Sequence, residues 1–171
     1  VVVYVIGGED EFGGRVATNE AYYPATNTWV KRAPMRVARE EMVAVTVNGV
    51  VYAIGGWVDS IDDVTGVNEA YYPATDSWVF KRPMPTPRAE FMAAVVNGVI
   101  YAIGGFDLPN WGLRVVEAYY PHTNSWVRKR SMPVGACCAA VAVVENVIFI
   151  FGGYTEQKDT DITQAYYYRT N

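Results

Sequence analysis

Apolar and polar residues alternate in short runs along the whole chain. Apolar runs such as Val50–Ile54 end after a few residues at Gly, Asn, Pro or a charged side chain. Interruptions this frequent leave too little room for helices of ordinary length and are typical of short β-strands. The pattern therefore predicts an all-β chain and no helix.

The pattern also repeats, with a period of about 48 residues. Each copy has a Gly-Gly pair after an apolar run, at Gly7-Gly8, Gly55-Gly56, Gly104-Gly105 and Gly152-Gly153. The segments EAYYPATNTW, EAYYPATDSW and EAYYPHTNSW begin at Glu20, Glu69 and Glu117, and a partial copy begins at Gln164. Self-similarity at a fixed period indicates a repeat architecture.

Each period has room for four strands. In the second period, apolar segments at Met42–Val47 and Val50–Ile54 flank Asn48-Gly49, the strongest two-residue signal for a tight hairpin. A variable polar stretch follows. It leads to a third strand at Val67–Tyr72, a Pro-Ala-Thr-Asp turn and a fourth strand at Trp78–Lys81.

Four antiparallel strands per repeat are typical of a β-propeller blade. The double glycine after strand two, Glu-x-Tyr-x-Pro at strand three and Thr-x-x-Trp entering strand four resemble the kelch repeat. This resemblance covers essentially the whole chain. It implies a β-propeller of four-stranded antiparallel kelch blades, with about three and a half blades present. Residues 1–171 then form a single kelch-repeat array, with blade strands within 1–32 (partial), 41–81, 90–130 and 138–168 (partial).

Two departures from the pattern predict weaker turns. Kelch repeats usually carry Asp between the tyrosine and the proline, where this chain has Tyr23, Tyr72 and Tyr120, so an acceptor that could cap the turn is missing. In the last repeat Glu145-Asn146 replaces the Asn-Gly hairpin turn, and we expect that turn to be less favourable.

The overall charge disfavours some classes of partner. The net charge is −4, without the basic excess of a nucleic-acid-binding surface. No apolar run approaches the roughly 20 residues of a membrane helix. The opening VVVYVIGG lacks a basic leader and a cleavage site, so it reads as a strand and not a signal peptide. We expect a cytoplasmic protein that binds neither nucleic acid nor membrane.

Metal and cofactor chemistry also lacks sequence support. His122 is the only histidine, and the repeat places it in a turn opposite the expected binding face. Cys137 and Cys138 are adjacent, so a disulfide between them would be strained, and we interpret both as small buried hydrophobic residues. No catalytic residue, metal site or cofactor is predicted, and we expect no enzyme activity.

The expected binding face carries loops of two kinds. Because strands alternate in direction, the loops between strands two and three emerge on the same side as the connections between blades. The former are acidic and the latter basic, which predicts positive charge near the centre that attracts an acidic ligand. In kelch-like ubiquitin-ligase adaptors, arginines of these connections hold carboxylates of a partner peptide. That resemblance implies partner-binding roles for Arg39 and Arg88, and we expect Arg36, in the same connection as Arg39, to bind the partner too. The alternative is structural: hydrogen bonds to loop carbonyls or ion pairs with Glu40 and Glu90.

Aromatic residues complete the predicted binding face. Phe12, Trp57, Phe106, Trp111 and Tyr154 lie in or beside the variable loops. Trp and Tyr are typical interface anchors, although residues directly after the double glycine could simply cover the end of a blade. Trp29, Trp78 and Trp126 recur in register and are expected to fill the spaces between blades.

These features predict an adaptor or scaffold that binds a partner protein or peptide through its loop face. The alternative is a carbohydrate-binding or sugar-modifying propeller with the loop tryptophans as stacking platforms. A ubiquitin-ligase role would need BTB and BACK regions, and actin binding, another kelch role, has no marker here. Three explanations of the partial ring stay open: a fragment of a longer chain, a homodimer that closes the propeller with about seven blades, or a small closed propeller.

Overall fold

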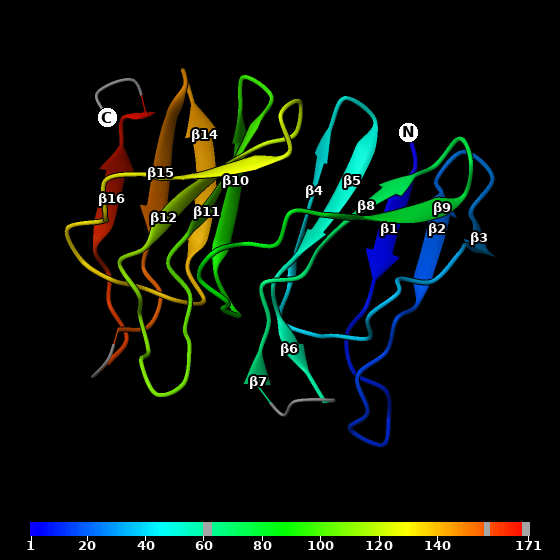
Figure 1. The fold of residues 1–171 in the computed structure, drawn as a ribbon, viewed down its shortest axis with the longest axis horizontal. Coiled ribbons are helices and arrows are strands. Elements are labelled where there is room, and N and C mark those ends of the chain that lie inside the picture. The colour runs from blue at the N-terminus through cyan, green and yellow to red at the C-terminus, as the bar shows by residue number, and fades with distance from the viewer. Residues whose placement is uncertain (60–62, 156–157, 169–171) are drawn as a thin grey trace.

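Four antiparallel sheets stand side by side in an arc in the computed structural model, which describes residues 1–59, 63–155 and 158–168 (Figure 1). The first sheet contains β1 (Val3–Ile6), β2 (Asn19–Tyr23) and β3 (Thr28–Lys31). The second contains β4 (Val43–Val47), β5 (Val50–Ile54), β8 (Asn68–Tyr72) and β9 (Ser77–Lys81). The third contains β10 (Met92–Val96), β11 (Val99–Ile103), β12 (Val116–Tyr120) and β13 (Ser125–Arg128). The fourth contains β14 (Ala140–Val144), β15 (Val147–Phe151) and β16 (Thr163–Tyr166).

The all-β prediction is confirmed, and the described residues contain no α-helix. The predicted strands of the second repeat agree with the structure to within one residue at each end. The structure adds one small element: β6 (Trp57–Val58) pairs with β7 (Asp63–Val64) inside a loop that the sequence marked only as variable and polar. No helix in these parts of the chain has the length and hydropathy to cross a bilayer.

The first two strands of each four-strand unit form the predicted tight hairpins. Asn48 and Gly49 have φ angles of 49° and 77°, and Asn97 and Gly98 have nearly the same values. Two consecutive positive φ angles define the type I′ turn, which matches the twist of the paired strands. Glu145 and Asn146 adopt this conformation too, at 48° and 64°, although neither is glycine.

The sheets pack face to face through their alternating apolar residues. One core cluster joins the second and third sheets and includes Ile54, Ile100 and Tyr119, and another joins the third and fourth. Two of the repeated tryptophans lie between sheets, as predicted: the Trp78 indole donates to the carbonyl of Ala33 at 2.7 Å, and Trp126 donates to the carbonyl of Arg82 at 2.8 Å. Each of these bonds ties a blade to the segment that enters it from the preceding blade. The prediction is wrong for Trp29, which is 55% exposed on the first sheet.

The turns between strands three and four do not lack an acceptor. The Tyr71 hydroxyl donates to Asp76 Oδ1 at 2.7 Å, and the amide of Ala33 donates to the same oxygen at 3.0 Å. The third sheet repeats the arrangement, where Tyr119 donates to Asn124 Oδ1 at 2.8 Å. The residue at the end of each turn therefore supplies a side-chain acceptor, although none stands before the proline.

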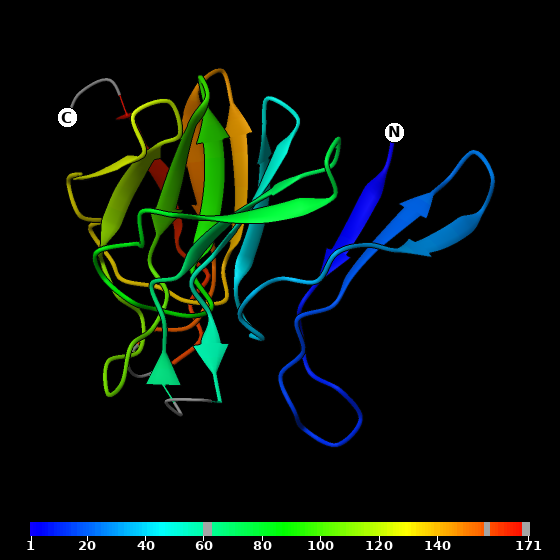
Figure 2. The ribbon, with the colours of Figure 1, turned by 45° about the vertical axis from the view of Figure 1, so that its right-hand side comes forward.

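The first and fourth sheets lie at opposite ends of the arc, so this stretch of chain does not close on itself (Figures 1 and 2). Each end sheet packs on its neighbour with one face and leaves apolar residues on the other. Val3 and Val5 are 46% and 49% exposed on β1, and Phe151 is 42% exposed on β15.

Candidate functional site

The loops after the double glycines all emerge on one side of the arc, the lower side in Figure 1. In each of the last three sheets, the residue after the double glycine pairs with the segment that precedes the inner strand. These bridges join Trp57 to Glu40, Phe106 to Ala89 and Tyr154 to Cys137. The two kinds of loop therefore emerge on the same face, as predicted from the strand directions. We call this the loop face.

Four of the predicted aromatic residues form one continuous row across the loop face. The ring of Trp57 lies 6.1 Å from that of Phe106, which stacks on Trp111 at 4.5 Å with an 11° angle between their planes. Trp111 in turn meets the edge of Tyr154 at 6.1 Å. The row thus spans three sheets. The fifth residue, Phe12, lies exposed in the loop after β1 and makes no ring contact with the other aromatic residues in the described part of the chain.

The side chains of this row differ in how much they are exposed to solvent. Phe106 is 4% exposed and supports Trp111 from below, whereas Trp111 and Tyr154 are 41% and 37% exposed. A large aromatic ring held by a buried neighbour presents apolar area without much loss of side-chain freedom on binding. Trp111 and Tyr154 are therefore the most exposed rings of this row.

Chain neighbours of the two exposed rings line an open cavity of about 640 Å³: Asn110 and Gly112 flank Trp111, and Thr155 follows Tyr154. Its walls come from the loop of the third sheet, the connection at Pro133 to Gly135 and the loop of the fourth sheet. Arg114 and Lys158 contribute the cationic side chains among its lining residues. The Arg114 Nε atom donates to the carbonyl of Met132 at 2.7 Å, which fixes the guanidinium at the wall.

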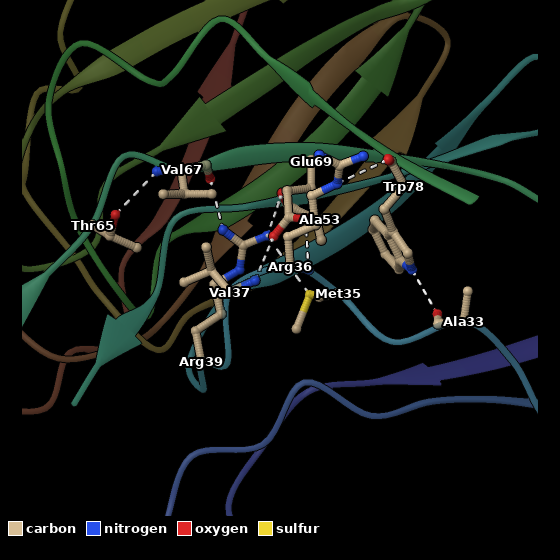
Figure 3. Close-up of polar contacts among 10 residues, drawn as sticks. All are labelled: Ala33, Met35, Arg36, Val37, Arg39, Ala53, Thr65, Val67, Glu69 and Trp78. Atoms are coloured by element: carbon tan, nitrogen blue, oxygen red, sulfur yellow. Dashed lines mark hydrogen bonds and ion pairs between the residues drawn. The ribbon is translucent and has the colours of Figure 1, made fainter. Parts of the chain in front are cut away.

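Arg39 and Arg88 do not reach this surface, contrary to the prediction that they contact a partner. Both are 0% exposed. Arg39 forms an ion pair with Glu69 at 3.2 Å and donates to the carbonyls of Val67 and Ala53, each at 3.1 Å (Figure 3). Burial lowers the pKa of Arg39 to about 10, and the charge of Glu69 opposes that shift. The side chain therefore remains charged at neutral pH, and its ion pair and hydrogen bonds connect strands inside the blade.

Arg88 repeats this arrangement one sheet further on. Its guanidinium lies 2.6 Å from Glu117 and donates to the carbonyl of Ala102 at 3.0 Å. The structural alternative considered from sequence describes these arginines, but the acidic partners are Glu69 and Glu117 on the third strands, not Glu40 and Glu90. Arg36 is exposed, yet its Nε atom donates to the carbonyl of Trp78 at 3.1 Å and its guanidinium lies over Phe80. Those contacts place it beside β9, apart from the aromatic row.

The fourth sheet replaces both members of the buried pair. Ala136 stands where the other two sheets have arginine, and Gln164 stands where they have glutamate. The Gln164 amide exchanges two hydrogen bonds with the backbone of Val134, each 3.0 Å long. Ile162, which occupies the position of Val67, lines the cavity. The cavity thus lies beside the place that an arginine fills in the preceding sheets.

Comparison with known proteins agrees with this repeat organisation. The family model described as "Kelch motif" matches residues 2–36, 38–85, 87–133 and 135–171. The chain belongs to the Kelch motif family. Beta-scruin from Limulus polyphemus is 39% identical to it over 54 residues, which are 32% of this chain and 6% of that protein. Kelch repeats generally mediate protein–protein interactions.

Some charges of the kelch loops are paired locally. Arg15, from the loop after β1, lies 2.8 Å from Glu40 and 2.7 Å from Asp59. Two of the cations expected near the centre, Arg39 and Arg88, are neutralised inside their blades. These two arginines therefore add no positive charge to the loop face, and Arg15 connects the first loop to the next one through its two ion pairs.

The histidine and the two cysteines, the remaining candidate metal ligands, lie at opposite ends of the blades. His122 is exposed in the turn between β12 and β13, away from the loop face, as expected. Cys137 is buried, as predicted, but Cys138 is exposed, which corrects its interpretation as a buried hydrophobic residue. The Cys138 thiol donates to the Glu90 carboxylate at 2.6 Å and lies 3.6 Å from the sulfur of Cys137. Burial raises the pKa of the Cys137 thiol, and partial desolvation of the sulfur together with the hydrogen bond to Glu90 raises the pKa of the Cys138 thiol.

Proposed function

We propose that this kelch chain is a non-catalytic module of a cytoplasmic adaptor or scaffold and binds an acidic peptide segment of a partner protein. The observation that carries the proposal is the aromatic row beside a cavity lined by Arg114 and Lys158. Trp111 supplies a supported apolar anchor, and the two cations favour a carboxylate at the cavity.

This proposal changes which residues make contact. Arg39 and Arg88 hold the blades in shape, because their side chains are buried and ion-paired. Trp111, Tyr154, Arg114 and Lys158 form the contact surface, and Phe106 supports Trp111 from within. Trp57 belongs to the same row, but its ring lies nearer the second sheet.

Peptide display followed by fluorescence polarisation tests this function. A random peptide library is selected against the chain, and affinities of the enriched peptides are measured for Trp111→Ala, Lys158→Ala and the control His122→Ala. We expect acidic peptides, a loss of about tenfold or more for Trp111→Ala, and wild-type affinity for His122→Ala. Lys158→Ala should cause a smaller loss that shrinks as salt is raised, because salt screens exposed charges.

Other results would contradict the proposal. Enrichment of basic or uncharged peptides would reject the acidic ligand, and equal losses for Trp111→Ala and His122→Ala would reject the site. The carbohydrate alternative draws on the same exposed indole, with Asp107 three residues from Asn110 and hydrogen-bonded to it at 2.7 Å. Protection of tryptophan fluorescence by sugars, with no peptide enriched, would favour that alternative.

A further inference from the structure

The segments that enter the inner strands have the same backbone shape in three sheets but different side chains. Glu41, Glu90 and Cys138 occupy equivalent positions, with φ angles of 53°, 48° and 54°. The amide of Glu90 donates to the carbonyl of Glu41, and the amide of Cys138 donates to that of Glu90, each at 3.0 Å. These bonds link the three segments directly, so that the side chain of Glu90 comes next to the thiols of the fourth sheet.

The left-handed conformation of Cys138 brings two neighbouring thiols together. In an extended strand, successive side chains point to opposite faces. The positive φ at Cys138 breaks that alternation, and the two sulfur atoms lie 3.6 Å apart. The sulfur atoms of Cys137 and Cys138 and a carboxylate oxygen of Glu90 all lie within 4.8 Å of one another.

We propose that Cys137, Cys138 and Glu90 bind one thiophilic divalent cation, of which Zn²⁺ is the natural representative. Zinc–sulfur bonds of about 2.3 Å at a tetrahedral angle separate two sulfur atoms by about 3.8 Å, close to the spacing observed here. Two thiolates and one carboxylate are a suitable donor set for such an ion, with a fourth position left to solvent. Cys138 is exposed and gives the ion a path to the buried sulfur of Cys137.

Binding exchanges protons for the metal ion. The thiols of Cys137 and Cys138 each release one proton, and the cation forms a bond to each sulfur; no oxidant or reductant takes part. The hydrogen bond from Cys138 to Glu90 is lost, and the carboxylate turns its oxygen to the metal. This inference goes beyond the proposed peptide binding and does not depend on it.

Titration of the reduced, metal-free chain with Co²⁺ tests the site, because thiolate coordination of Co²⁺ produces charge-transfer absorption. We expect one Co²⁺ per chain, displaced by Zn²⁺. Cys137→Ser and Cys138→Ser should each lose the two-thiolate spectrum. Glu90→Gln should keep that spectrum but weaken Co²⁺ binding by about tenfold or more. Mutating residues that only hydrogen-bond a metal ligand already lowers metal affinity by about this factor. Glu41→Gln, at the equivalent position one sheet away, should bind like the wild type.

The folded state of each variant is checked by circular dichroism, so that a lost spectrum reports a lost ligand. No thiolate absorption in the folded wild type would overturn the proposal. Half an ion per chain would also overturn it, because the ion would then bridge Cys138 residues of two molecules. Equal Co²⁺ affinity of Glu90→Gln and Glu41→Gln would remove the carboxylate from the site and contradict the three-ligand assignment.

Discussion

The Arg39–Glu69 pair shows how a single residue can organise a kelch blade from within. Arg39 joins the segment that enters the inner strand to the backbone of β5 and to Glu69 on β8. Removing two charges from water is costly, so such a pair stabilises the fold only when both partners are present and hydrogen-bonded. The fourth sheet, with Ala136 and Gln164, shows that the same backbone also accepts a neutral combination.

We therefore predict that Arg39→Ala costs about 3–5 kcal/mol of unfolding free energy, because the Glu69 carboxylate would remain buried without a partner. The double variant Arg39→Ala with Glu69→Gln, which copies the fourth sheet, should recover about 1–3 kcal/mol of that loss. Urea denaturation measures both values, and Arg130→Ala, at an exposed side chain, is the control. Additive losses in the double variant would show that the two residues do not stabilise each other.

Asp76 gives a prediction about pH. Hydrogen bonds from the amide of Ala33 and then from the Tyr71 hydroxyl lower the pKa of its carboxyl group from the ordinary value of 3.8. A group whose pKa is lower in the folded state stabilises the fold above its unfolded pKa and loses that contribution as pH falls through the folded pKa. Asp76→Asn keeps an oxygen acceptor, as Asn124 does in the next sheet.

The variant should therefore fold normally and be somewhat less stable than the wild type at neutral pH. This difference should shrink below a pH of about 4, where the carboxyl group becomes protonated. Urea denaturation at several pH values measures it, with Asp63→Asn as a control at a carboxyl outside this turn. A stability difference that is the same at neutral and acidic pH would contradict the assigned role of the charge.

At the scale of single elements, the hairpin turns offer a comparison within one molecule. All three type I′ turns have the same backbone shape, but only Glu145-Asn146 lacks glycine. Left-handed conformations cost a residue with a long side chain roughly 1–2 kcal/mol, whereas glycine and asparagine adopt them more readily. Replacing Glu145-Asn146 with Asn-Gly should therefore stabilise the chain by about 1 kcal/mol, measured as a higher Tm or urea midpoint.

The reverse change provides the matched control for this prediction. Asn48→Glu with Gly49→Asn should destabilise the chain by a similar amount. A Cβ added at Gly49 would meet no atom within 4 Å, so backbone strain alone is tested there. No change in either variant would show that the turn residues do not limit the stability of these hairpins.

The elements that the sequence predicted well are those that depend on neighbouring residues. Asn48-Gly49 determines its own turn, and the spacing of Trp78 determines where the outer strand begins. The predicted contacts between distant segments were less accurate. Arg39 was expected to bind a partner, or else to bond loop carbonyls or pair with the adjacent Glu40. It bonds backbone carbonyls, but its acidic partner is Glu69 on another strand. The last repeat replaces the arginine with Ala136 and the glutamate with Gln164. This joint replacement was the sequence signal that could have identified the two residues as a pair.

In the candidate site, too, the features fixed by the repeat were predicted well and the contacts between distant residues were not. The repeat placed Trp57, Phe106 and Tyr154 on one face, because each follows a double glycine. It could not show that Trp111 would stack on Phe106, since no other repeat has an aromatic residue at that offset. The thiol of Cys138 was expected to be buried, and its exposure follows from a positive φ that residue type alone does not predict.

At the scale of the whole molecule, the outer faces of the two end sheets leave apolar side chains uncovered. The outer face of the first sheet exposes Val3 and Val5, and the outer face of the fourth exposes Val144 and Phe151. Between the sheets, equivalent positions are covered by the next blade. Apolar faces and open sheet edges of this kind favour association with another surface.

We therefore predict that the 171-residue chain associates in solution, with a mass by light scattering that rises with concentration above 19.0 kDa. Val5→Lys with Phe151→Lys should reduce association and leave the Tm nearly unchanged, because both side chains are already half exposed. The exposed turn variant His122→Lys is the control.

A plateau at twice the chain mass would indicate that two arcs close one ring, whereas continued growth would indicate that further blades normally cover these faces. A constant monomeric mass at all concentrations would contradict the prediction, because the exposed end faces would then be stable in water without a partner.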